Sequence, residues 1–158
     1  MDELVDLCIP FLKKNLKLSV DKKQQTRKYI KKVVALEQER LKKLSEIGEL
    51  TEFFFSDKLE YSKNLLVWKK IKLDNVKTNL EKVSELLEKI PEDNWTNDSI
   101  EDSIYTYLKA KELKVGEYLW PMRVALTGKK ASPSPYEVAE VLGKSESLKR
   151  IKNAISKI

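Results

Sequence analysis

Apolar residues recur at helical spacing along most of this chain, and no run alternates strongly enough to predict a strand. The clearest example lies between residues 74 and 87, where the recurring residues are Val76, Leu80, Val83, Leu86 and Leu87. Residues three and four positions apart share one face of an α-helix, so this spacing predicts a buried stripe. With only four glycines and five prolines in 158 residues, the chain also has few helix breakers. The sequence therefore predicts an all-α fold.

One polar segment, Pro91-Glu92-Asp93-Asn94, interrupts the helical pattern near the middle of the chain. Turn-forming residues cluster there between two periodic regions. Just after it, Asn97 and Asp98 are of the type that begins a helix. We therefore expect two small helical subdomains, residues 1–92 and residues 93–158.

Helix-capping residues and apolar spacing predict the helices of each subdomain. In the first, Asp2 marks one helix start and Ser19 with Asp21 marks another, and a further helix is expected over residues 36–47. The adjacent aromatics Phe53–Phe55 cannot all face one way on a helix, so we expect them to be buried between layers. In the second subdomain, the expected helices are residues 98–110, 116–126, 134–142 and 145–155.

The chain lacks the residues that most enzymes use for chemistry. It has no histidine, the commonest general base and metal ligand, and its single cysteine, Cys8, cannot build a thiolate metal site or an internal disulfide. Its glycines are isolated, which excludes a Gly-rich phosphate-binding loop. We therefore expect no catalytic residue, no metal and no cofactor in this chain. Because no signal or membrane-spanning segment is present in the sequence, we also expect a cytoplasmic protein with no membrane partner.

The formal net charge of +6 is unevenly distributed. Residues 13–32 are rich in lysine and hold one acid, Asp21, whereas residues 92–102 are acidic. Clustered lysines attract phosphate groups with an affinity that falls with salt, which favours RNA as a partner. Two alternatives stay open: a basic helical protein–protein interaction module with no RNA role, and a DNA-binding helix-turn-helix over residues 134–155.

The most unusual segment spans residues 119–144, where Arg123 stands inside an apolar run. A charged side chain leaves water only when it is paired. We therefore expect Arg123 at a rim, with its stem among apolar neighbours and its guanidinium aimed at an anionic or planar group, either a neighbouring carboxylate or RNA. Trp95, Trp120 and Tyr136 could stack on unpaired bases, although aromatics at helical spacing are more often part of a core.

An ordered set of short motifs resembles the carboxyl-terminal region of bacterial glutamyl-tRNA synthetases. The segment Pro121–Gly128, PMRVALTG, is similar to the family signature P-[LM]-R-x-A-[LV]-T-G. Tyr136-Glu137 and Leu142-Gly143-Lys144 follow at the family's spacing. The upstream pieces that resemble the family are Ile9–Leu12, Leu36–Leu41 with Leu44, and Phe53–Phe55. Together these pieces cover nearly the whole chain in the expected order.

The resemblance implies an all-α cage of two helical subdomains that grips the anticodon. The family's full-length enzyme attaches glutamate to tRNA-Glu using ATP. Its catalytic domain, which holds ATP and Mg, has a histidine-containing signature that a chain without histidine cannot carry. The resemblance therefore implies that this fragment is not itself an enzyme. Its partners would be the tRNA-Glu anticodon arm and the missing amino-terminal catalytic domain, and we expect it to be a monomer.

The resemblance also implies which residues contact tRNA. Arg123 matches the arginine that contacts the anticodon loop. Arg40 matches the position associated with reading the third anticodon base, where arginine resembles enzymes that charge only tRNA-Glu and glutamine resembles those that also charge tRNA-Gln. Ser132, Pro133 and Pro135 lie in the loop that touches the splayed bases, although relatives often have Thr-Pro and then Leu there. The expected phosphate contacts are Lys28, Lys32, Lys129 and Lys130.

Overall fold

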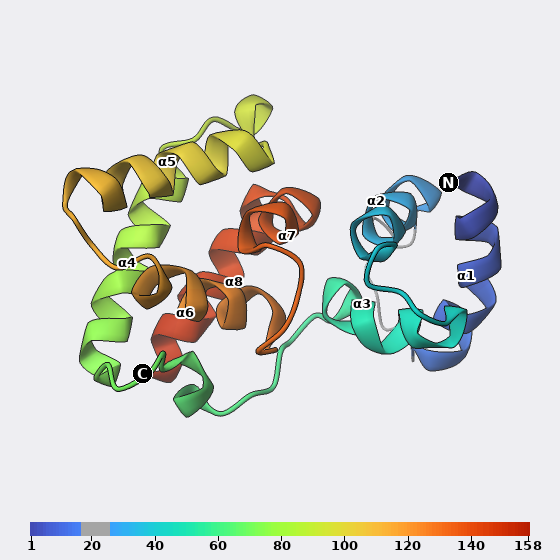
Figure 1. Ribbon diagram of the computed structural model, residues 1–158, viewed down its shortest axis with the longest axis horizontal. Helices are drawn as coiled ribbons and strands as arrows, with labels where there is room; N and C mark the ends of the chain where they lie inside the picture. Colours follow the sequence, from blue (N-terminus) through green and yellow to red (C-terminus); the bar gives the residue numbers. More distant parts are fainter. Residues whose placement is uncertain (17–25) are drawn as a thin grey trace. The chain divides into compact units, whose positions relative to one another are not determined.

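The structure is a computed structural model that describes residues 1–16 and 26–158 (Figure 1). Helices, joined by turns and irregular segments, make up the described residues, and no strand occurs among them. The predicted all-α fold is confirmed. The chain divides into two compact units, Met1–Leu59 and Glu60–Ile158, and each is described by itself.

The first unit packs its helices around a small aromatic and aliphatic core. Its described helices are α1 (Asp2–Asn15), α2 (Arg27–Glu37), the short 3-10 helix η2 (Leu44–Glu46) and α3 (Ile47–Phe55). The α-helices contact one another in every pairing. The residues that they bury include Val5, Cys8, Leu12, Val33, Val34, Ile47, Phe53, Phe54 and Phe55. The burial predicted for the three adjacent phenylalanines is confirmed.

The helix predicted over residues 36–47 is wrong, because α2 ends at Glu37. The main-chain carbonyl of Glu37 accepts hydrogen bonds from the N–H groups of Arg40 at 2.9 Å and Leu41 at 3.0 Å, which closes a turn. The Glu46 carboxylate then accepts from the N–H groups of Lys42 and Lys43, each at 3.3 Å. Polar contacts at both ends of this segment thus outweigh its helical spacing.

Two predicted helix starts also differ. The start expected at Ser19 and Asp21 lies outside the described residues, and the described part of α2 begins after Thr26, whose hydroxyl accepts from the N–H of Tyr29 at 3.2 Å. Asp2 does not cap α1, because Met1 occupies the cap position. The Asp2 carboxylate lies 3.0 Å from the Lys31 ammonium instead, and this hydrogen bond and charge hold the pKa of Asp2 below its ordinary value.

In the second unit, α6 lies against several of the other helices. Its helices are η3 (Lys63–Leu66), α4 (Leu73–Glu88), η4 (Glu92–Asn94), α5 (Asn97–Ala110), α6 (Gly116–Thr127), α7 (Pro135–Leu142) and α8 (Lys144–Lys157). Helix α6 contacts α4, α7, α8 and η3 (Figure 1). The apolar stripe of α4 is buried as its spacing predicts, through Val76, Leu80, Val83 and Leu87.

The division between the compact units differs from the predicted boundary between residues 92 and 93. That boundary falls within the second unit, at η4, and the helices on either side of it, α4 and α5, pack on each other. The polar residues of this segment therefore reverse the chain between two helices of one core. A turn within one core and a boundary between two subdomains give the same sequence signal.

Cationic side chains close the carboxyl ends of two helices in the second unit. The Lys144 ammonium donates to the carbonyls of Glu88 at 3.0 Å and Ile90 at 2.6 Å, at the end of α4. The guanidinium of Arg150, 4% exposed, donates to the Leu126 carbonyl at 2.7 Å, at the end of α6. The last carbonyls of a helix have no partner within it, and a cation there also opposes the helix dipole. These contacts fix where α4 and α6 stop.

Two further properties concern the described residues alone. Within residues 1–16 and 26–158, no helix combines the length and the apolar composition that crossing a bilayer requires. In the same part of the chain, no three His, Cys, Asp or Glu side chains are grouped so that they could hold a metal ion.

Candidate nucleic-acid interface

The loop between α6 and α7 is held at both of its ends. At the first end, Gly128 adopts a left-handed conformation, φ 68°, which glycine reaches without the steric cost of a side chain. The Thr127 hydroxyl donates to the Arg123 carbonyl at 2.7 Å and accepts from the N–H of Lys129 at 3.0 Å. At the second end, Ser134 and Glu137 form a reciprocal cap at the start of α7. The chain therefore enters and leaves this loop in fixed directions.

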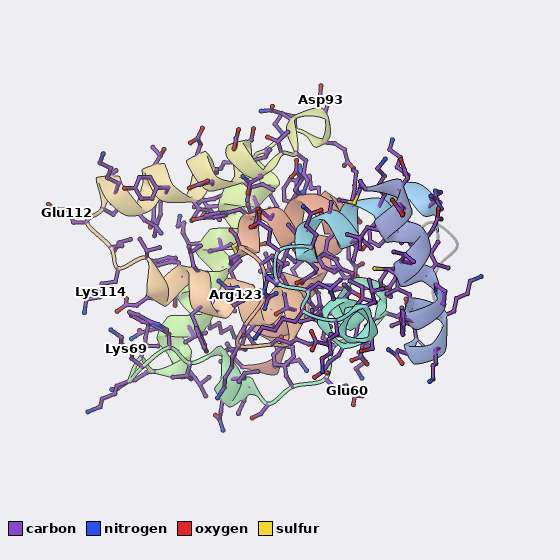
Figure 2. The ribbon with its side chains drawn as sticks, turned by 45° about the vertical axis from the view of Figure 1, so that its right-hand side comes forward. Glu60, Lys69, Asp93, Glu112, Lys114 and Arg123 are labelled. Carbon is purple, nitrogen blue, oxygen red and sulfur yellow. The ribbon has the colours of Figure 1, made fainter. Side chains whose placement is uncertain are left out.

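Arg123 holds the middle of the same loop. This partly exposed side chain extends from α6, where Figure 2 labels it. Its Nη1 donates to the Ser132 carbonyl at 2.7 Å, the Ser132 hydroxyl at 2.6 Å and the Pro133 carbonyl at 2.8 Å. These acceptors are neutral, whereas the sequence suggested an anionic or planar partner. The structure thus gives Arg123 a definite task, which is to fix the Ser132–Pro133 backbone.

The other residues predicted for this loop differ in their exposure. Ser132 is partly exposed, but Pro133 and Pro135 are buried, and Pro135 forms the first turn of α7. Lys129 is partly buried and Lys130 is exposed. The structure therefore brings Arg123, Ser132 and Pro133 into contact. Lys129 and Lys130 lie in the same loop, and both prolines are buried.

An open cleft of about 540 Å³ lies beside this loop. Its lining residues are Tyr61, Ser62, Asn64, Leu65, Val67, Trp120 and Lys130. The Trp120 indole N–H donates to the Leu65 carbonyl at 2.9 Å, which fixes the ring at the wall. Lys157 places its ammonium 4.8 Å from the centre of the Tyr61 ring. Burial raises the pKa of Tyr61 to about 12, so its phenol stays neutral at ordinary pH.

Only one of the three aromatics proposed to stack on bases faces this cleft, namely Trp120. Trp95 is buried and its indole N–H donates to the Ala139 carbonyl at 2.8 Å. Tyr136 is also buried, and burial, together with the charge of Glu101, raises its pKa to about 12. The core role that aromatics usually have thus applies to Trp95 and Tyr136. Tyr61, which sequence reasoning missed, lies in a polar stretch with no periodic signal.

The remaining predicted residues lie in the first unit. Arg40, just beyond α2, places its Nη1 at 2.9 Å and 3.3 Å from the two carboxylate oxygens of Glu37. The Glu37 side chain is completely buried and that of Arg40 is 35% exposed. Glu37 was not among the predicted site residues, although an acid three positions before an arginine is a recognisable pairing signal.

The basic residues of α2 fall into two sets. Arg27 and Lys31 form ion pairs with carboxylates of α1, at 2.6 Å from Asp6 and 3.0 Å from Asp2. Lys28 and Lys32, the two predicted phosphate contacts, are exposed and lie one helical turn apart. In the described part of the chain they have no ion-pair partner. Their charges are therefore less compensated locally than those of their neighbours.

Comparison with known proteins decides the family. The sequence model of the anticodon-binding domain matches residues 3–155. The chain belongs to the anticodon-binding domain family. The domain is 40% identical over 162 residues to the glutamate–tRNA ligase of Clostridium tetani, a match that covers 100% of this chain and 31% of that ligase. It is 37% identical over 158 residues to the ligase of Clostridium botulinum strain Eklund 17B, which covers 98% of this chain and 31% of that ligase.

This anticodon-binding domain spans about 31% of the length of the curated relatives that it matches, in their carboxyl-terminal portion. It resembles the crystal structure of a glutamate tRNA ligase from Elizabethkingia meningosepticum, with a TM-score of 0.74 and 22% identity over 96% of this chain and 29% of that one. The ligase from Elizabethkingia anophelis gives a TM-score of 0.68 at 23% identity, over 96% and 28%. These likenesses show a shared fold, and the predicted resemblance is confirmed.

Proposed function

We propose that this anticodon-binding domain recognises the anticodon arm of tRNA-Glu as the carboxyl-terminal part of a glutamate–tRNA ligase. Family membership and the names of the relatives support this proposal. Attachment of glutamate, with ATP and Mg, would belong to a separate catalytic part. The domain then contributes specificity through binding, and no residue of its own takes part in the chemical step. We further propose that it works in the cytoplasm and as a monomer.

The observation that carries the proposal is the contact of Arg123 with the Ser132–Pro133 backbone. The two N–H groups of one Nη1, shared among three acceptors, hold this loop, so little conformational entropy remains to be lost when RNA binds. A preorganised loop can hold splayed bases in a defined order. In this proposal Arg123 acts on RNA largely through the loop that it supports.

The cleft beside the loop offers a place for an unpaired base. Trp120 and Tyr61 supply ring faces, and Lys130 supplies a positive charge at the wall. Stacking on an aromatic side chain contributes about 1–3 kcal/mol per base and tolerates any base, because each base has a flat face. We propose that one nucleotide of the anticodon loop places its base there, with its phosphate near Lys130.

In the first unit, Arg40 would read the third anticodon base. Its Nη1 is held by Glu37, whereas its Nε and Nη2 have no partner in the described part of the chain. A guanidinium edge with two parallel donors bonds well to a base that offers two acceptors and poorly to one that offers a donor. This chemistry supports discrimination of tRNA-Glu from tRNA-Gln. Lys28, Lys32 and Lys129 would then contact phosphates.

The test measures the affinity of this chain for full-length tRNA-Glu, tRNA-Gln and an unrelated tRNA. Fluorescence anisotropy reports the binding, at several salt concentrations. We expect the tightest binding with tRNA-Glu and a steep fall of log affinity with log salt. A duplex DNA of similar length tests the helix-turn-helix alternative. Equal affinity for all RNAs would contradict anticodon recognition. Absence of any RNA binding would favour the protein–protein interaction module.

A further inference from the structure

Glu37 is a completely buried carboxylate that ends α2, and it accepts two hydrogen bonds from the Nη1 of Arg40, at 2.9 Å and 3.3 Å. A carboxylate removed from water is costly unless a cation and hydrogen bonds compensate it. Arg40, with 35% of its side chain exposed, supplies such a cation from the surface side. The pair therefore links the interior of the first unit to its surface.

Main-chain contacts tie Arg40 to Glu37 a second time. The Glu37 carbonyl accepts the N–H of Arg40 at 2.9 Å, in the turn that ends α2. Both the backbone and the guanidinium of Arg40 are thus attached to one residue. A long side chain that is held at two points retains few rotamers, which lowers the entropy cost of placing its remaining donors.

The atoms that Glu37 holds determine which donors remain. Glu37 binds Nη1, so Nε and Nη2, which lack partners among the described residues, lie along the other edge of the guanidinium. That edge carries two parallel N–H groups in the fork geometry that recognises paired acceptors. Glu37 thereby occupies Nη1 and leaves the bidentate edge of Arg40 without a partner among the described residues.

The pairing also changes what Arg40 contributes electrostatically. An ion pair at 2.9 Å has almost no net charge, so its attraction for a distant phosphate is weak, whereas its short-range hydrogen bonds remain directional. Lys28 and Lys32 on α2 differ, because no ion-pair partner lies near them in the described residues. Arg40 is therefore suited to a neutral base edge, and the lysines are suited to phosphates.

We propose that Glu37 is the positioning residue of Arg40, and that discrimination between anticodons is a property of this pair and not of Arg40 alone. The proposal rests on the base-reading role of Arg40 proposed above. It implies coupling between the two positions. Arg40→Gln removes the cation that faces a buried carboxylate, and the additional change Glu37→Gln removes that carboxylate charge.

The experiment uses this chain in four forms: wild type, E37Q, R40Q and the double variant E37Q/R40Q. Affinities for tRNA-Glu and tRNA-Gln are measured over a salt series, and the free energy of unfolding is measured by urea denaturation. We expect E37Q to lower the ratio of the two affinities by about tenfold, the loss of one well-placed charge-assisted contact. We expect the double variant to discriminate no worse than R40Q and to be more stable than R40Q, which is the signature of a coupled pair.

The outcomes separate this inference from the function on which it rests. If R40Q retains the wild-type affinity ratio, the reading role of Arg40 fails and the inference fails with it. If R40Q no longer discriminates between tRNA-Glu and tRNA-Gln but E37Q still does, Arg40 reads the base and Glu37 has no positioning role. If the salt slope of R40Q falls by about 1, Arg40 contacts a phosphate, which also contradicts the inference.

A conservative variant covers the case in which E37Q does not fold. E37D keeps the charge near Arg40 but shortens the side chain by one methylene, so the guanidinium must shift to keep its hydrogen bond. If Glu37 only stabilised the fold, E37D would leave the ratio of the affinities for tRNA-Glu and tRNA-Gln unchanged. We expect E37D to lower the affinity ratio several-fold with its salt slope unchanged, and an unchanged ratio in folded E37D would overturn the proposal.

Discussion

The Nη1 of Arg123 lies 2.7 Å from the carbonyl oxygen of Ser132 and 2.6 Å from its hydroxyl oxygen, across nine residues of chain. The same nitrogen donates to the Pro133 carbonyl at 2.8 Å. One side chain of α6 thus holds two consecutive residues of the following loop. An arginine set in an apolar run is explained by the polar backbone that it satisfies, and its effect on RNA would pass largely through that backbone.

Replacing Arg123 by alanine should therefore weaken binding of tRNA-Glu and loosen the loop. Hydrogen bonds from a charged donor contribute about 1.5–3 kcal/mol each, and we expect the affinity to fall by roughly 10–100-fold. Fluorescence anisotropy measures the affinity, and circular dichroism shows whether the helices persist. If R123A folds and binds tRNA-Glu with wild-type affinity, the assignment of this loop to the interface is wrong.

Ser132→Ala is the matched control for Arg123. It removes the hydroxyl acceptor but leaves both carbonyl acceptors of the loop in place. We expect its affinity for tRNA-Glu to lie within about threefold of wild type, because two of the three contacts persist. A loss as large as that of R123A would instead indicate that the Ser132 hydroxyl itself binds RNA.

The fold could be predicted where local spacing and packing agree. Helix α5 was expected over residues 98–110 and spans Asn97–Ala110, and the three adjacent phenylalanines are buried as expected. The helix expected over residues 36–47 failed because the Glu46 carboxylate competes for its backbone N–H groups. Periodicity does not reveal such competition.

The candidate site was predictable only in part, because its contacts join distant positions. The loop around Ser132 was identified through resemblance, but its attachment to Arg123 depends on the direction in which α6 ends. Tyr61 reaches the cleft through tertiary packing and has no motif of its own. Glu37 could have been found from its spacing to Arg40, yet nothing in the sequence shows that its carboxylate is buried.

Lys130 provides a test of phosphate contact at the cleft. If it binds one phosphate, K130A should reduce the slope of log affinity against log salt by roughly 1, and the affinity for every tRNA should fall similarly. The matched control is K111A, since Lys111 is also an exposed lysine, at the end of α5 and outside the proposed interface. An equal change of slope in K111A would mean that RNA responds to total charge alone.

Trp120 provides a spectroscopic test of base stacking. A base stacked on the Trp120 ring should quench tryptophan fluorescence when tRNA-Glu is added, whereas the buried Trp95 should be unaffected. We expect the quenching to disappear in W120F, with less than about tenfold loss of affinity, because phenylalanine keeps a ring face. The W95F variant serves as the control and should retain the quenching. Quenching that survives in W120F would place the stacked base elsewhere.

The alkaline stability of the second unit should reveal two tyrosines, one partly and one fully buried, whose pKa values are strongly raised. Burial is the main reason that the pKa values of Tyr61 and Tyr136 rise to about 12, against an ordinary value of about 10. Because the folded state holds these protons more tightly than the unfolded state, each tyrosine contributes stability that is fully present below pH 10 and is lost as the pH rises toward 12. Unfolding free energies measured by urea denaturation between pH 9 and 12 should therefore decline less steeply in Y61F/Y136F than in wild type. Absorbance at 295 nm should show a late ionisation step that this variant lacks. If wild type ionises every tyrosine near pH 10 while its circular dichroism is still that of the folded state, the two phenols are more accessible to water than the structure indicates.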